Sequence, residues 1–169
     1  MTSPSAQTWI QQLKMNRHVE GGWYSEVYRS SLLLPAATIS SSFTGDRPAS
    51  THIYFLLEKE NFSAFHRIKS DEIWHFYSGD PIIVYEIEPS GQLTEHILGN
   101  DPLAGQSLCC VIKANNWFAS RVATGGEYGL AGCTVAPGFD FADFELAEKE
   151  KLKKEFPGHE ELIAALCRQ

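Results

Sequence analysis

The clearest pattern in the sequence is a series of short apolar stretches, separated by turn-forming residues, that begins at Thr51. Within the stretches apolar and polar residues tend to alternate, which is typical of strands with one buried face. Many short strands at regular spacing favour a sandwich or barrel, so the fold class predicted is all-β. The predicted strands are 23–29, 51–58, 62–67, 72–78, 82–88, 93–97, 108–113, 117–122 and 128–136.

Helices are predicted only toward the two ends of the chain. Ser5 can cap a helix over 5–14, in which apolar residues recur at helical spacing. Glu and Lys at supportive spacing predict a second helix over 139–156, and a last short helix follows at 159–167. The polar stretch 35–48 is predicted to be a connection that contains at most a short strand.

The sequence has no internal repeat and no linker-like segment. At 169 residues it is predicted to form a single domain, 1–169. Within that domain we expect the barrel at about 19–136 and the C-terminal helices at about 140–167.

Composition and charge exclude several classes of protein. The formal net charge of −7 argues against a nucleic-acid partner, because such proteins normally carry a basic surface. No apolar run has the length of a signal peptide core or of a membrane span, so no membrane partner is expected. The four cysteines show no CxxC spacing and are expected to be reduced thiols. These features predict a cytoplasmic protein.

The segment 63–79 carries the most chemical information. It predicts two strands joined by a polar turn, with Glu72, Trp74 and Phe76 on one face of the second strand. A carboxylate that shares a strand face with two aromatic rings is costly to bury without a partner. We therefore expect His66, on the preceding strand, to contact Glu72.

Several segments resemble one family of cupins. Glu72 and Gly79 have the spacing of the end of the first cupin motif. The resemblance extends to a subfamily catalogued as a domain of unknown function, and it implies a cupin-type double-stranded β-helix, or jelly roll, with short N-terminal and C-terminal helices. The segments that carry it are HVEGGWYSEVYRS (18–30), HIYFLL (52–57), FHRIKSDEIWHFYSGDP (65–81), GQ (105–106), NNWFA (115–119) and GCTVAPGFDFADFEL (132–146).

The resemblance also bears on metal binding. Metal-binding cupins usually have a second histidine where this chain has Ala64, and a last histidine where it has Phe118. Only His66 and Glu72 remain of the usual four ligands, whereas a stable divalent site normally needs three. We therefore expect no metal and no other cofactor. A metal-dependent oxygenase is kept as an alternative, since His75 or an unaligned residue could complete a site.

Two residues are candidates for catalysis and eight for ligand binding. His66 can act as a general base near neutral pH, and Glu72 would orient it. Aromatic side chains can stack on a flat ring, and arginines can hold phosphate oxygens. The ligand-binding candidates are Tyr54, Trp74, Phe76, Trp117, Phe118, Arg29, Arg47 and Arg67.

These candidates predict a cupin that binds a small molecule, a nucleotide or nucleotide-sugar, in its barrel. The resemblance to metal-free dTDP-sugar epimerases adds isomerase or epimerase activity through His66, although Glu72 stands where those enzymes have lysine. A non-catalytic metabolite-binding module is the alternative. Cupins commonly pair, so a homodimer is expected, with 23–29 as an exchanged strand. His18 and Glu20, beside a tight turn, are expected to reach the neighbouring subunit.

Overall fold

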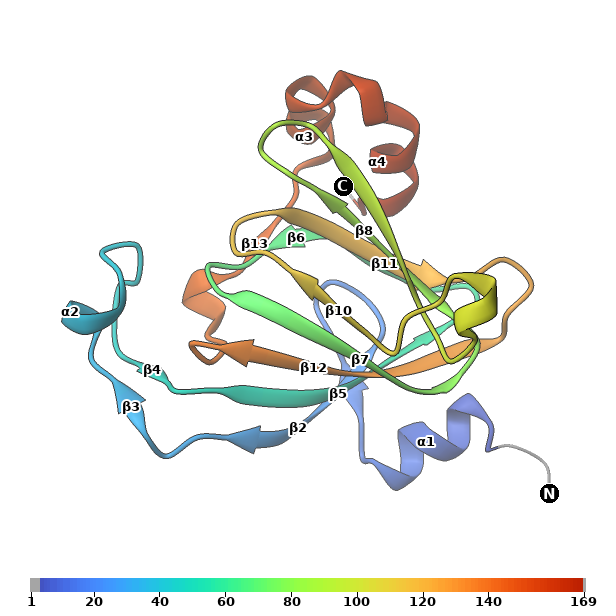
Figure 1. Cartoon of the computed structure of the whole chain (residues 1–169), viewed down its shortest axis with the longest axis horizontal. Helices are drawn as coiled ribbons and strands as arrows, with labels where there is room; N and C mark the ends of the chain where they lie inside the picture. The colour runs from blue at the N-terminus through green and yellow to red at the C-terminus, as the bar shows by residue number, and fades with distance from the viewer. Residues whose placement is uncertain (1–3, 169) are drawn as a thin grey trace.

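The computed structural model describes residues 4–168, in which two antiparallel sheets face each other (Figure 1). The first sheet has six strands, in the order β1 (Asn16–Arg17), β2 (Trp23–Arg29), β5 (Thr51–Glu58), β12 (Tyr128–Ala136), β7 (Asp71–Gly79) and β10 (Cys109–Ile112). The second has five, in the order β13 (Glu145–Leu146), β6 (Phe62–Arg67), β11 (Trp117–Val122), β8 (Ile82–Ile87) and β9 (Leu93–Leu98). The fold is a jelly roll, as the sequence predicted.

The strand bounds follow closely from the alternation of apolar and polar residues. Five predicted strands, at 23–29, 51–58, 62–67, 117–122 and 128–136, have the same bounds in the structure. Of the other four, β8 and β9 differ from the prediction by one residue at one end, and β7 and β10 by one residue at both ends. Such agreement arises because glycine, proline and polar turn residues stand directly beside most of the strands.

The core between the sheets explains the alternation along β7. Trp74 is 1% exposed and belongs to the same core cluster as Phe55 of β5 and Phe118 of β11 in the opposite sheet, whereas Tyr77, on the other face, is 45% exposed. Glu72 lies on the inward face with Trp74, as predicted, and is buried. The inward direction of Glu72 is therefore fixed by the strand register that buries these rings.

The two strands of the segment 63–79 are joined by a turn, as predicted, but they lie in different sheets and do not form a hairpin. β6 pairs with β11 and β13 in the five-stranded sheet, whereas β7 pairs with β10 and β12 in the six-stranded sheet. The polar turn between them therefore carries the chain from one sheet to the other. The sequence pattern cannot distinguish these cases, because a strand that changes sheets has the same alternation and turn as a hairpin.

The helices cover the outer faces of the sheets. Helix α1 (Ala6–Gln12) packs through Ile10 on Leu56 and Leu130 of the six-stranded sheet. Helices α3 (Lys149–Glu155) and α4 (Glu160–Leu166), joined by the 3-10 turn η3 (Pro157–His159), cover the five-stranded sheet (Figure 1).

The helix predicted over 139–156 is shorter than expected. Its first half is instead a 3-10 turn, η2 (Phe141–Asp143), followed by β13, which pairs with β6. The Asp140 side chain accepts a hydrogen bond from the Ala142 amide, which favours the turn over a regular helix. Three phenylalanines of this stretch line the cavity described below, and this tertiary packing overrides helix propensity.

An extended arm projects from the barrel between β2 and β5 (Figure 1). It contains β3 (Leu33–Leu34), β4 (Arg47–Pro48) and the short helix α2 (Ala36–Ile39), so the predicted polar connection has more structure than expected. The remaining 3-10 turn, η1 (Pro102–Ala104), lies between β9 and β10.

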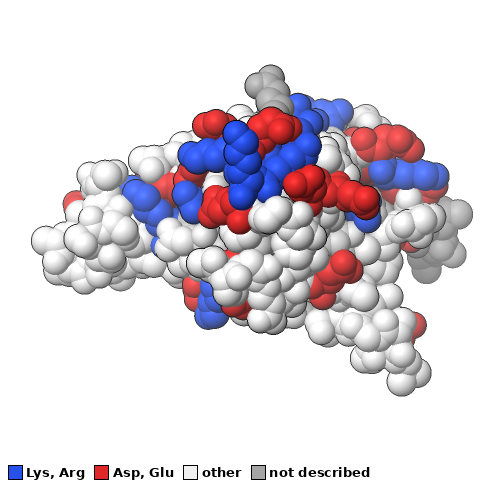
Figure 2. All heavy atoms as spheres, turned by 90° about the horizontal axis from the view of Figure 1, so that it is seen from above, with Lys and Arg blue, Asp and Glu red and all other residues white. Residues whose placement is uncertain are grey.

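The face seen in Figure 2 carries Lys and Arg interspersed with Asp and Glu, without a continuous basic surface. Among residues 4–168, no helix combines the length and the apolar character needed to span a bilayer.

Candidate functional site

A cavity of about 310 Å³ lies between the two sheets. Apolar side chains make most of its wall, and a few ionisable groups converge within it, which is the usual composition of a ligand site. The lining residues are His18, Glu20, Tyr24, Glu26, Arg29, Thr51, Ile53, Phe55, His66, Ile68, Glu72, Trp74, Cys133, Val135, Phe139, Asp140, Phe141 and Phe144.

Glu20 lies at the centre of the cluster of ionisable side chains in the cavity. Its Oε2 lies 3.1 Å from Nε2 of His66 and 3.4 Å from Nδ1 of His18, while Ser63 donates a hydrogen bond of 2.8 Å to Oε1. Although burial opposes it, the nearby His66 and His18 and the Ser63 hydroxyl hold the pKa of Glu20 below its usual value. Glu20 is therefore an ionised carboxylate at neutral pH.

The hydrogen bonds of His66 fix where its protons lie. Its Nδ1 is 2.8 Å from the carbonyl oxygen of Ala64, which can only accept, so Nδ1 carries a hydrogen. Nε2 lies 3.1 Å from Oε2 of the Glu20 carboxylate, so a second proton on His66 would be shared between these two atoms. Burial lowers the pKa of His66, so this second proton is readily released. The pair is suited to exchange a proton with a ligand.

His18 forms the other side of the Glu20 site. Burial opposes its charge, but the hydrogen bond and the negative charge of Glu20 raise the pKa of His18 above its usual value. The imidazole packs edge-on against Tyr24, with ring centroids 4.8 Å apart, and faces Phe141 at 6.2 Å. His18 is thus held between an ionised carboxylate and the aromatic wall of the cavity.

Glu72 has the opposite protonation state. Burial, with the negative charge of Glu20, raises its pKa to about 8, so Glu72 is mostly protonated at pH 7. The Cys133 thiol and the Trp74 indole are its neighbours in the cavity wall. The cavity therefore holds one ionised carboxylate and one neutral carboxylic acid.

The predicted partner of His66 was wrong. His66 contacts Glu20 rather than Glu72, because its strand lies in the sheet opposite β7. The expectation that His18 and Glu20 reach another subunit was also wrong, since both line the cavity of their own chain. The turn after them allows the chain to fold back, because Gly21 and Gly22 have φ angles of 118° and 74°, which residues with a side chain rarely adopt. The Gly-Gly pair was the available signal that the chain folds back here.

The predicted aromatic residues lie in several parts of the molecule. Trp74 lines the cavity, and Phe118 lies directly beneath His66, with ring centroids 4.0 Å apart. Phe76 packs against the inner core outside the cavity, and Tyr54 lies on the outer face near α1. Trp117 belongs to the layer beneath the C-terminal helices. The rings that surround the cavity come instead from Tyr24, Phe55 and residues 139–144.

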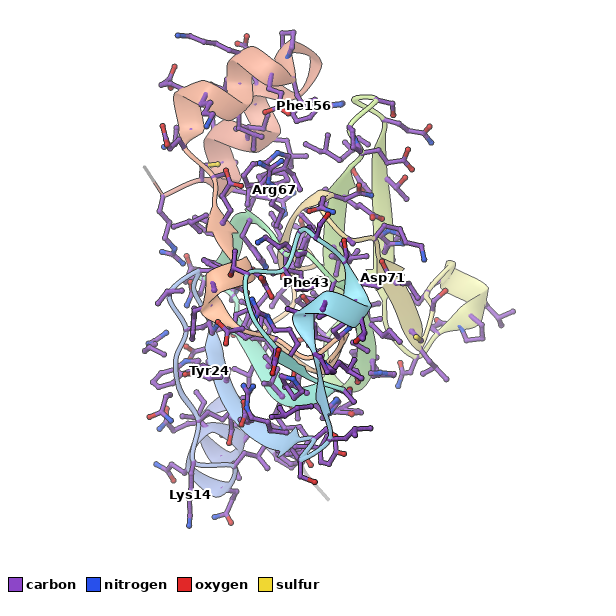
Figure 3. The ribbon with its side chains drawn as sticks, turned by 90° about the vertical axis from the view of Figure 1, so that its left-hand side faces the viewer. Lys14, Tyr24, Phe43, Arg67, Asp71 and Phe156 are labelled. Atoms are coloured by element: carbon purple, nitrogen blue, oxygen red, sulfur yellow. The ribbon has the colours of Figure 1, made fainter. Side chains whose placement is uncertain are left out.

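The three predicted arginines also lie in different parts of the molecule. Arg29 lines the cavity, where two of its nitrogens bind Glu26 at 3.1 and 2.7 Å. Arg47 is buried outside the cavity and forms a two-point pair with Asp143 at 2.6 and 2.8 Å. Arg67 pairs with Glu145 and lies toward the C-terminal helices, well away from Tyr24 in Figure 3.

A jelly roll that encloses ionisable residues between its sheets is the architecture of a cupin, and solved structures support this class. Oxalate decarboxylase from Bacillus subtilis superposes with a TM-score of 0.55 at 14% identity, over 89% of this chain and 36% of that one, which shows the shared fold alone. A search of curated proteins found no match.

The sequence itself identifies the family. Residues 7–147 match the family described as Cupin superfamily (DUF985), and the chain belongs to it. A hypothetical protein from Leishmania major is 31% identical with a TM-score of 0.91, over 98% of this chain and 100% of that one. Protein SO0799 from Shewanella oneidensis is 36% identical with a TM-score of 0.87, over 98% and 99%.

The residues of the cavity do not fit the metal centre that many cupins hold. Both ring nitrogens of His66 are within hydrogen-bonding distance of protein oxygens, and Phe118 stands against its ring. Within residues 4–168, no three His, Cys, Asp or Glu side chains are arranged to hold a metal ion.

Proposed function

We propose that this cupin binds a small polar metabolite in its cavity and transfers a proton on it, as an isomerase or epimerase does. The observation that carries the proposal is the pair of carboxyl groups in one cavity, Glu20 ionised and Glu72 protonated. Two titratable groups with opposite protonation states are the arrangement that acid–base catalysis requires. Perturbed ionisable groups in a cavity also favour function over structure.

Each group has a distinct role in this reaction. The Glu20–His66 pair removes or returns a proton on a carbon beside a carbonyl group. The Glu20 carboxylate accepts the proton from the ligand, since both ring nitrogens of His66 face protein oxygens. Glu72 is the acid that donates a hydrogen bond to the carbonyl oxygen, where negative charge develops. In the dTDP-sugar epimerases that the sequence resembles, a lysine holds this position, and a protonated Glu72 supplies a donor there without a full positive charge.

The size and charge of the cavity define the ligand further. A volume of 310 Å³ is at the low end of the range for ligand pockets, about 300–1,000 Å³. The cavity therefore suits a sugar ring or a body of similar size. A nucleotide-sugar would place its sugar inside and its phosphates near Arg29, whose charge is already neutralised in part by Glu26. Free sugars and small carbonyl metabolites are accordingly the first candidates, and nucleotide-sugars the second.

A ligand screen followed by isotope exchange tests the proposal. Free sugars, sugar phosphates, nucleotides and nucleotide-sugars are screened by thermal melting, in which a ligand at a hundredfold its Kd adds about 2.7 kcal/mol, or roughly 5–10 °C. Each hit is then incubated in D₂O, where proton transfer beside a carbonyl places deuterium on carbon, detected by NMR.

The variants H66N and E72Q separate binding from catalysis. We expect both to retain binding within a fewfold and to lose deuterium incorporation, while E95Q, at an exposed position of β9, behaves as the wild type. Hits that bind the wild type without exchange in D₂O would contradict catalysis and favour a non-catalytic binding module. Loss of exchange only after metal removal would favour a metal-dependent enzyme.

We also propose that the chain forms a homodimer through β2, as an extension of the sequence-based expectation. β1 pairs with this strand only at Trp23 and Tyr24. Within the described part of the chain, no strand lies beside Ser25 to Arg29 on the side opposite β5. Val27 and Tyr28 on this edge are half exposed. Light scattering that finds a monomer at micromolar concentration would refute the proposal.

A further inference from the structure

The guanidinium group of Arg168, just after α4, is bound to the turn that carries Glu20. Its Nε donates a hydrogen bond of 3.1 Å to the carbonyl oxygen of Glu20. Its Nη2 donates to the carbonyl oxygen of Phe62 at 2.9 Å and to Oδ1 of Asn61 at 2.7 Å. The group also lies over the Phe62 ring, 4.5 Å from its centroid.

These bonds hold the backbone of the residue whose side chain organises the cavity. The carbonyl oxygen that Arg168 binds also accepts a hydrogen bond of 2.9 Å from the Ala64 amide, one strand position from Ser63, which binds the Glu20 carboxylate. Gly21 lies so close to Phe62 and Arg168 that a side chain there would overlap both. The turn is therefore enclosed between β6 and the guanidinium.

The position of Arg168 is itself set by the packing of the C-terminal helices. Ile163, Leu166 and Cys167 are at most 4% exposed and belong to the apolar layer on the outer face of the five-stranded sheet. This part of the chain lies beyond residues 7–147, which match the family. A segment outside the family match thus reaches the backbone of a cavity residue.

We infer that Arg168 is a positioning residue for the Glu20 carboxylate, and that the C-terminal helices clamp the turn 18–22 against β6. The consequence for catalysis rests on the proposed function, but the clamp does not. Its effect on the cavity can be measured without a ligand, so the two proposals fail independently.

The histidines of the cavity report the position of Glu20. His18 faces the carboxylates of Glu20 and Glu72, and His66 faces Glu20 and His18. When the turn loosens, the carboxylate moves away and His18 loses the partner that raises its pKa. The titration of the Hε1 protons of both histidines can be followed by NMR between pH 5 and 9.

The variant R168M keeps an apolar stem over Phe62 and removes every donor. We expect the midpoint of His18 to fall toward its ordinary value of about 6.5 while the chain remains folded. The matched control is R121M, because Arg121 also combines hydrogen bonds to Tyr85, at 3.1 and 2.9 Å, with a place over its ring. This control should leave both histidine midpoints unchanged.

A double variant distinguishes positioning from general loosening. In an E20Q background, where the carboxylate is absent, R168M should produce no further change in the His18 midpoint. If R168M fails to fold, N61A removes one acceptor of the clamp and should shift the midpoint in the same direction by less. Unchanged midpoints in folded R168M or N61A, or an equal shift in the E20Q background, would overturn the inference.

Discussion

Replacement of Glu72 by glutamine should remove the contribution of this carboxyl group to the pH dependence of folding stability between pH 5 and 8. The amide has the shape of the protonated acid but does not ionise. In the native chain burial and Glu20 raise the pKa of Glu72 to about 8, whereas in the unfolded chain it has the ordinary value of 4.5. The folded state therefore binds a proton that the unfolded state has released throughout this interval.

The sign and the magnitude follow from linkage. Because the pKa is raised on folding, the stability contribution is fully present below pH 4.5 and is lost as the pH rises toward 8. Each pH unit between the two pKa values is worth about 1.4 kcal/mol, so a rise from pH 5 to pH 8 costs about 3–4 kcal/mol at this one carboxyl group. That is a large fraction of the free energy of unfolding of an ordinary domain, about 5–15 kcal/mol.

Urea unfolding followed by tryptophan fluorescence measures the effect at pH 5, 6, 7 and 8. The free energy of unfolding of E72Q minus that of the wild type cancels the groups that both chains share. This difference should grow by about 3–4 kcal/mol from pH 5 to pH 8, because only the wild type loses stability at this position. The surface variant E95Q should show no such trend. A difference between wild type and E72Q that stays constant with pH would mean that Glu72 is ionised in the folded state, and the assignment of an acid to the cavity would be wrong.

Three further predictions concern stability, and urea unfolding at pH 7 checks each. D143A leaves the buried Arg47 guanidinium without its two-point partner and should cost about 3–5 kcal/mol, and a loss below about 1 kcal/mol would mean that the pair is solvated. G21A places a side chain against Phe62 at a φ angle of 118° and should reduce stability by more than 1 kcal/mol; wild-type stability would contradict the enclosed turn. L152A truncates the buried side chain of α3, which is 1% exposed, and should cost about 2–5 kcal/mol, whereas a neutral result would mean that the C-terminal layer is not packed.

The sequence predicted the strands because their physical cause is local. Alternation of apolar and polar residues follows directly from the period of a strand, and the turn residues beside each strand limit its length. The inward direction of Glu72 was predictable for the same reason, since it shares a face with Trp74. The N-terminal helix and the final helix, with their apolar stripes, were likewise local features.

The predictions that were wrong concern features that are determined by contacts between residues far apart in the sequence. The assignment of β6 and β7 to different sheets depends on how the whole jelly roll closes, so the contact between His66 and Glu72 was wrong although both residues line the cavity. The role of Glu20 was missed because nothing local indicates that a turn near the N-terminus will lie against β6. The arginines were misleading since buried and surface ion pairs are indistinguishable in sequence.

The distribution of ionisable groups inside the molecule argues that the cavity is functional. Asp143 and Arg47 are buried as a neutralised pair, which is a structural solution to burying charge. Glu20 and Glu72 are different: they are two acids in one cavity, and the charge of one raises the pKa of the other. An apolar residue in place of Glu72 would remove this cost, because nothing in the packing of β7 requires a carboxyl group there. A costly group retained where a ligand can reach it is explained by its chemistry, so Glu72 is the residue at which the proposed proton transfer is most sharply tested.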